Sequence, residues 1–105
     1  MTNPHAEAEQ IVNEVHYAAC LEKHGVPEHL REGLIRYLVR HIPTGHFLTA
    51  VLSNDLTEAV SRGDEVSIDG LPAIVRFLRN DVPWLAWGSQ TIVKAWLTWM
   101  REQGS

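Results

Sequence analysis

Glycine and proline divide this chain into segments that are each only long enough for a short helix. Gly25, Pro43, Gly63 and Pro83 stand between stretches in which apolar residues recur three or four positions apart. This spacing places apolar side chains on one face of an α-helix, whereas the alternation typical of a β-strand occurs only around residues 66–68. The sequence therefore predicts an all-α fold, a compact bundle of about five to six short helices.

Two helices open the predicted fold and pack against each other. The first covers about residues 4–24, starting at Pro4 and stopping at Gly25. Pro27 begins a second helix, which ends at Ile42 because a proline follows it. The turn between the two helices is short, so antiparallel packing is expected. The apolar stripe of the first helix consists of Ala8, Ile11, Val12, Val15, Ala18 and Ala19.

Polar residues that can cap a helix mark where the remaining helices begin. Such a residue accepts a hydrogen bond from a free N–H group in the first turn, and a Glu three positions later completes a capping box. The predicted elements are a helix from Gly45 capped by Thr44, a helix launched by the box Asp55 to Glu58 and interrupted at residues 62–64, a helix over residues 69–80, a loop over residues 81–88, and a final helix capped by Ser89 that ends near Glu102.

The composition limits which partners and which cellular location are expected for the protein. The net charge of −4 repels phosphate backbones, so duplex nucleic acid is not an expected partner. No apolar run approaches the roughly 20 residues of a membrane span. Cys20 is the only cysteine and no signal peptide opens the chain, which favours a cytoplasmic location. Residues 1–105 are expected to form a single domain, frayed at residues 1–3 and 103–105.

Histidine and cysteine spacing on the first helix suggests a metal site at first sight. His16, Cys20 and His24 lie four residues apart on one face, so either adjacent pair could share a zinc ion. The outer two are about 12 Å apart along the axis, so a site would need a further ligand such as His29. We therefore predict no metal and no cofactor, with Cys20 as a small buried apolar residue. No catalytic motif occurs either, which predicts that the chain is not an enzyme.

An anion site has better physical support than a metal site. Arg36 and Arg40 share one helical face, and the N–H groups at the start of the third predicted helix follow soon after them. Together they could hold a phosphate group or a nucleotide. The alternative is that the arginines form a solvated face and pair with the acidic middle of the chain. The candidate anion-binding residues are Arg36, Arg40, Thr44, Gly45 and His46.

Tryptophan is concentrated in the last quarter of the chain. Two indoles fall in the predicted loop and two, Trp96 and Trp99, in the final helix, which is apolar around most of its circumference. Because a small core cannot easily bury so much apolar surface, we predict that Trp99 and one loop tryptophan face a partner protein or a second copy, as in a homodimer through the final helix. The alternative is a core that encloses all four rings. The predicted interface consists of Trp84, Trp87, Trp99, Asp55, Glu58 and Asp64.

The stretch from His41 to Leu97 resembles a group of small uncharacterised proteins encoded by phages and prophages. The shared pattern is IPTGHFLTAVLSNDLTEA over residues 42–59, LPAIV over residues 71–75, WGS over residues 87–89 and AWL over residues 95–97. Those proteins usually carry glycine where His46 stands here. The resemblance implies a phage origin, a small helical fold and a bacterial host cell as the location, and it supplies no activity or site residues.

These observations favour a non-catalytic binding protein as the function of the chain. We predict an accessory protein of phage type that inhibits a host defence or another host process by contacting a host or phage protein. The acidic middle of the chain and the tryptophans would supply the contact surface. The alternative, from a different class, is a protein that binds or sequesters a small ligand, such as a nucleotide or another anion, at the candidate anion site.

Overall fold

Helices account for every regular element in the part of the chain that the structure describes. The structure is a computed structural model that describes the backbone of residues 4–104 and the side chains of residues 8–99. No strand occurs within residues 4–104, so the predicted all-α fold is confirmed. The elements are α1 (Pro4–His24), α2 (Glu28–Arg40), α3 (His46–Leu52), α4 (Leu56–Arg62), α5 (Glu65–Asp69), α6 (Leu71–Asp81), the 3₁₀ turn η1 (Trp84–Ala86) and α7 (Gln90–Gly104).

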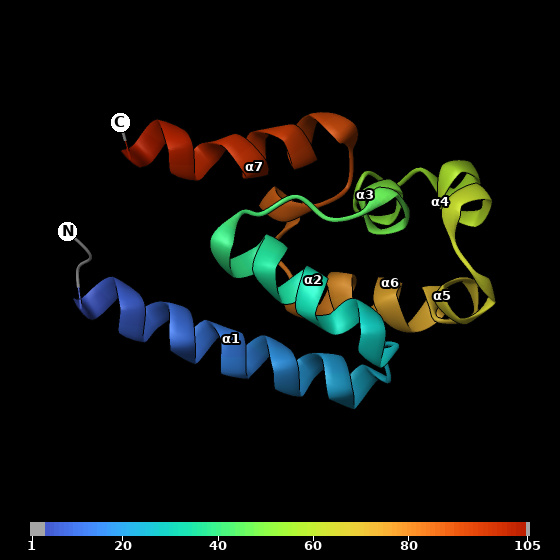
Figure 1. The fold of residues 1–105 in the computed structure, drawn as a ribbon, viewed down its shortest axis with the longest axis horizontal. Coiled ribbons are helices and arrows are strands. Elements are labelled where there is room, and N and C mark those ends of the chain that lie inside the picture. The colour runs from blue at the N-terminus through green and yellow to red at the C-terminus, as the bar shows by residue number, and fades with distance from the viewer. Residues whose placement is uncertain (1–3, 105) are drawn as a thin grey trace.

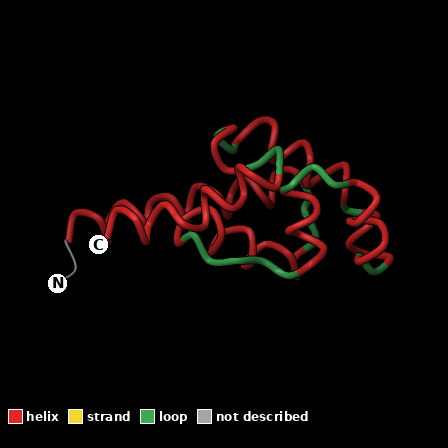
Figure 2. The backbone as a smooth tube through the Cα atoms, turned by 90° about the horizontal axis from the view of Figure 1, so that it is seen from above, coloured by secondary structure: helices red, strands yellow, loops and turns green. Residues whose placement is uncertain are grey.

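The helices surround one core, and α1 packs against both α2 and α6. Figure 1 shows α1 and α2 running antiparallel from a tight turn, as predicted, with α6 behind α2 and the α4–α5 pair at the right edge. Figure 2 shows the same chain from above, with α1 and α7 extending beyond the remaining helices at one end. The largest fully buried side chains are Tyr37, Phe77, Leu21, Leu34, Leu52, Ile74, Leu78 and Val26.

Helix caps that depend only on local sequence are confirmed. The Asp55 side chain accepts a hydrogen bond from the Glu58 N–H at 3.1 Å, and the Ser89 hydroxyl accepts one from the Ile92 N–H at 3.2 Å. The capping box at residues 55–58 is formed only in part, because the Glu58 carboxylate pairs with Arg62 and the Asp55 N–H donates to the Ala50 carbonyl. These caps fix the starts of α4 and α7.

Three predicted boundaries are wrong for identifiable reasons. The second helix ends at Arg40 because His41 adopts a left-handed backbone, with φ at 56°, and closes the last turn with its N–H. Thr44 does not cap α3, since its hydroxyl lies 2.9 Å from the Thr49 hydroxyl instead. The predicted helix over residues 69–80 is α6, and before it lies the unpredicted α5, capped by the Asp64 side chain.

The ends of the chain also differ from the prediction where they are described. Helix α7 continues to Gly104, beyond the predicted end near Glu102. The predicted fraying of residues 1–3 and 105 lies outside the described residues. The predicted loop at 81–88 contains the short turn η1. After this turn, the backbone N–H of Gly88 donates a 2.7 Å hydrogen bond to the Leu52 carbonyl of α3.

The apolar stripe predicted for the first helix faces solvent instead of the core. Ile11, Val12 and Val15 are among the most exposed large apolar residues of the protein. Helix α1 packs on α2 and α6 through the opposite face of its C-terminal half, where Cys20 and Leu21 are buried. Periodicity identifies an apolar face correctly, yet it does not say what covers that face.

Candidate functional site

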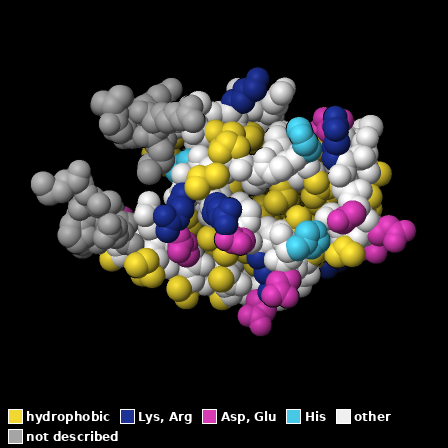
Figure 3. Space-filling view, viewed as in Figure 1, with side chains coloured by type: hydrophobic (Ala, Val, Ile, Leu, Met, Phe, Trp, Pro, Cys, Tyr) yellow, Lys and Arg dark blue, Asp and Glu magenta, His cyan; other side chains and the backbone are white. Residues whose placement is uncertain are grey.

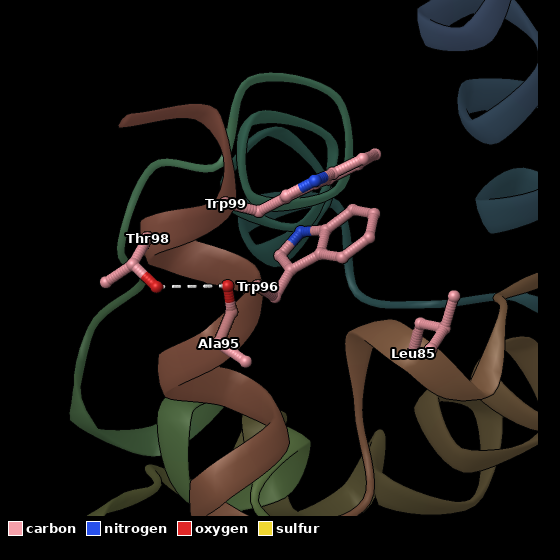
Figure 4. Close-up of a pocket in the computed structure, with 5 residues that line it drawn as sticks. All are labelled: Leu85, Ala95, Trp96, Thr98 and Trp99. Atoms are coloured by element: carbon pink, nitrogen blue, oxygen red, sulfur yellow. Dashed lines mark hydrogen bonds between the residues drawn. The ribbon is translucent and has the colours of Figure 1, made fainter. Parts of the chain in front are cut away.

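An apolar groove lies between helix α7 and the 3₁₀ turn η1. It encloses about 450 Å³. Figure 4 shows Trp96 and Trp99 projecting from α7 on the same side, with Leu85 of η1 across the groove. The residues that line it are Leu85, Ala95, Trp96, Thr98 and Trp99, none of which is ionisable. Among the residues whose side chains the structure describes, the lining offers no acidic or basic group, and a groove of this composition can accept an apolar side chain.

Trp96 forms a rigid wall of the groove. Its indole N–H donates a 2.8 Å hydrogen bond to the Tyr37 backbone carbonyl. The His41 ring stacks on it, with ring centres 4.2 Å apart, and the His41 Nδ1 lies 2.6 Å from the Trp96 carbonyl oxygen. The left-handed backbone of His41 that ends α2 also places its ring against α7. Contacts within the chain therefore hold the Trp96 ring in one orientation.

Two further indoles are exposed, and of these Trp99 lines the groove whereas Trp84 does not. Trp99 is 48% exposed and its ring centre lies 5.8 Å from that of Trp96, while Trp84 of η1 is 73% exposed. Trp87 is half-buried against the core. The alternative in which one core encloses all four indoles is therefore wrong. Trp96 was absent from the predicted interface, although its spacing of three residues from Trp99 places the two on neighbouring positions of one helix face.

Tyr37 supports the groove from inside the core. Its buried hydroxyl donates a 2.7 Å hydrogen bond to the Ala86 carbonyl of η1, and its own carbonyl accepts the Trp96 N–H. Burial raises the pKa of the Tyr37 hydroxyl above the ordinary tyrosine value of 10.0. One core residue thus connects α2, η1 and α7.

We expect Tyr37→Phe to lower the free energy of unfolding by about 1–3 kcal/mol, because the Ala86 carbonyl would remain buried without a donor. The variant should also change the pH dependence. In the parent, the unfolded tyrosine ionises first, so stability is complete below pH 10.0 and is lost as the pH rises above it. Urea denaturation should show that the free energy of unfolding falls less between about pH 7 and about pH 11 in the variant than in the parent. Tyr17 and Cys20, whose pKa values burial also raises, contribute to the loss that remains. An unchanged pH profile would contradict the assigned role of the hydroxyl.

The acidic residues of the predicted interface do not share one surface with the tryptophans. Asp55 and Glu58 line a second groove, of about 470 Å³, formed by α3, α4 and the other face of α7, together with His46 and Lys94. Asp64 lies at the α4–α5 junction, at the opposite end of the molecule from the C-terminal half of α7 (Figure 1). There the Ser67 N–H, donating at 2.8 Å, holds the pKa of the Asp64 carboxyl below its usual range.

The structure separates the candidate anion-binding residues. Arg36 pairs with Glu32, and Arg40 pairs with Glu14 of α1 at 2.7 Å. Both arginines line a groove of about 880 Å³ between α1 and α2, whereas His46 lines the groove beside α7, and Thr44 and Gly45 line neither. Both arginines are exposed, as the alternative of a solvated face expects, but their ion-pair partners come from α1 and α2 and not from the acidic middle of the chain.

Each histidine or cysteine considered for a metal site has its own local partner. His24 lies 2.7 Å from Asp81, His29 lies 3.0 Å from the Ser67 hydroxyl, and the His16 ring nitrogen lies 3.7 Å from the Cys20 sulfur. Within the described residues, no group of three or more His, Cys, Asp or Glu side chains could hold a metal ion. Burial, together with the Asp81 charge, raises the pKa of the Cys20 thiol, which disfavours the reactive thiolate.

Comparison of the chain with protein-family models, with curated proteins and with solved structures gives no significant match. Among the helices described here, none combines the length and apolar character needed to cross a bilayer.

Proposed function

We propose that the chain is a non-catalytic protein-binding protein and that the groove between α7 and η1 is its contact site. The observation that supports this function is the exposure of Trp84 and Trp99 beside an apolar groove whose wall, Trp96, is already fixed. Tryptophan is enriched among the residues that contribute most to binding energy at protein interfaces. A partner that inserts an apolar side chain between these rings would remove most of their exposed surface from water.

The partner proposed here is a protein of the bacterial host or of the phage itself. The resemblance of residues 41–97 to phage and prophage proteins supports such a partner, and a small chain without catalytic groups in its groove can act by occupying a surface of its target. We propose accordingly that it is an accessory protein of phage type, active in the bacterial cytoplasm, that inhibits a host defence or another host process. The groove would cover part of the target that the host process requires.

We expect the double variant Trp84→Ala, Trp99→Ala to lose its partner, because it removes the exposed indole that lines the groove and the exposed indole next to Leu85 in the chain, while the core is untouched. The loss should exceed about tenfold in affinity, and the melting temperature should change little. The measurement is affinity purification of the tagged protein from an expressing bacterium, with quantification of co-purified proteins by mass spectrometry. Isolated pairs are then compared by calorimetry.

Leu56→Ala provides a matched control, since Leu56 is 68% exposed but lies on α4, away from the groove. It should retain the partner. Equal recovery of the partner by the double variant and the parent would contradict the proposed contact site. A rise in melting temperature with nucleotide that Arg40→Ala abolishes would instead support the small-ligand function.

A further inference from the structure

Helix α1 carries apolar side chains on the face that points away from the rest of the protein. Val15 is 66% exposed at the middle of this face, and Ile11 and Val12 precede it by one turn. Ala8, Ala18 and Ala19 are also exposed and complete the stripe. Figure 3 shows the hydrophobic side chains along the lower edge of the molecule, over α1. One edge of the stripe, at Val15 and Ala18, borders the groove between α1 and α2, and the remainder faces solvent. Exposed apolar residues over more than three turns of helix mark an interaction surface.

We propose that this stripe, residues 8–19 of α1, binds the same stripe of a second copy of the chain. In the pair, the two α1 helices run antiparallel about a twofold axis beside Val15. An isologous contact of this kind requires the surface to be complementary to itself. Size and charge along the stripe both meet this requirement.

The sizes of the side chains match in the antiparallel arrangement. On one side of Val15, the twofold axis brings Ile11 next to Ala18 of the second copy. On the other side of Val15, it brings Val12 next to Ala19 of the second copy. Each large exposed residue thus faces a small one, and the alanines allow the helices to approach closely. A parallel pair would instead place Ile11 against Ile11 and leave the alanines facing one another.

The charges beside the stripe favour the same arrangement. Glu9 and Lys23 lie on one flank of the stripe, about 21 Å apart along the helix, and neither has an ion-pair partner among the described residues. Antiparallel pairing places Glu9 beside Lys23 of the second copy, and the symmetry repeats this contact at the other end. Parallel pairing would oppose Glu9 to Glu9, which is repulsive. Glu22, two turns after Val15 on the same face, meets Ala8 of the second copy in the antiparallel pair and another Glu22 in a parallel pair, so this charge also disfavours the parallel orientation.

This surface is separate from the groove of the proposed function. Figure 1 shows α1 and α7 on opposite sides of the molecule, with α2 between them. A dimer through α1 leaves both copies of the α7 groove open, so one dimer could bind two partner molecules. It also differs from the homodimer through the final helix that the sequence suggested.

Sedimentation velocity and light scattering on the purified full-length chain test the proposal. We expect a dimer that dissociates on dilution. Val15→Arg should raise the dissociation constant by about 100-fold or more, because each copy would bury an unpaired charge at the axis. Val66→Arg is the matched control, since Val66 is 59% exposed on α5, and it should leave the dimer intact. Both variants should keep the parental circular dichroism spectrum and melting temperature at high dilution.

Charge exchange tests the orientation of the helices independently. Glu9→Lys and Lys23→Glu should each weaken the dimer, and the double variant should restore it, because the pair is re-formed with reversed sign. A chain that stays monomeric up to about 1 mM would overturn the proposal. So would a dimer whose dissociation constant Val15→Arg leaves unchanged, or a double charge variant that dimerises no better than the single variants. Trp99→Ala should leave the dimer intact, so loss of partner binding and loss of self-association can be separated. A dimer that Trp99→Ala abolishes would assign self-association to α7 instead.

Discussion

Phe77→Ala is expected to lower the free energy of unfolding by about 3–5 kcal/mol, a large share of the total that a domain of this size possesses. Phe77 is fully buried in α6, and its ring meets the edges of two α1 residues. The ring centre of Tyr17 lies 6.1 Å away and that of His24 lies 6.4 Å away. The substitution removes the side chain that joins α1 to α6 and leaves a cavity that neither helix can close by itself.

Chemical denaturation followed by far-ultraviolet circular dichroism measures this effect as a fall in the transition midpoint. Val75→Ala is the matched control, because Val75 belongs to the same helix but is exposed. The control should lose about 1 kcal/mol or less. Similar losses in the two variants would mean that α1 and α6 are not joined by a closely packed core.

Gly70→Ala is expected to destabilise the protein by about 1–3 kcal/mol, for a purely steric reason. Gly70 lies between α5 and α6 with ordinary helical backbone angles, so an alanine could adopt its conformation. An added Cβ, however, would lie 2.6 Å from the Cδ atom of Pro27. The proline ring cannot rotate away as a flexible side chain would, so the turn between α1 and α2 would have to move away from α6.

Gly33→Ala should change stability in the opposite direction. Gly33 lies inside α2, and an added Cβ would make an ordinary 3.6 Å contact with Leu48. Alanine at a compatible helical position stabilises a protein by about 0.4–1 kcal/mol, because the unfolded chain loses freedom. Thermal denaturation of the two variants side by side measures the difference. If Gly70→Ala and Gly33→Ala changed the stability in the same direction, the contact between Pro27 and Gly70 would not be close.

Local chemistry explains which parts of the fold the sequence predicts. The side chains of Asp55 and Ser89 accept bonds from N–H groups three residues ahead, so their role follows from neighbouring residues alone. The end of α2 depends on His41, whose ring needs Trp96 of a distant helix to stack upon. No local signal announces such a contact. Helix α5 has only five residues, too few for periodicity to reveal it.

The candidate site is predictable in composition but not in position. Four tryptophans near the end of a small chain indicate a surplus of apolar surface, and Trp84 and Trp99 are indeed exposed. The groove itself exists because η1 folds back along α7, and Leu85 then lies across from Trp96. The stripe on α1 likewise appears in the sequence, but only the positions of α2 and α6 show that it remains uncovered.

The hydrogen bonds of Tyr37 determine which positions of this protein can vary freely over evolution. A change at residue 37 or 96 would disturb folding and recognition together, because the Trp96 indole is held by the backbone of a fully buried residue. Residues 84, 85, 98 and 99 are exposed and are not part of that connection. These four positions of the proposed contact site could therefore change while the scaffold is inherited unaltered.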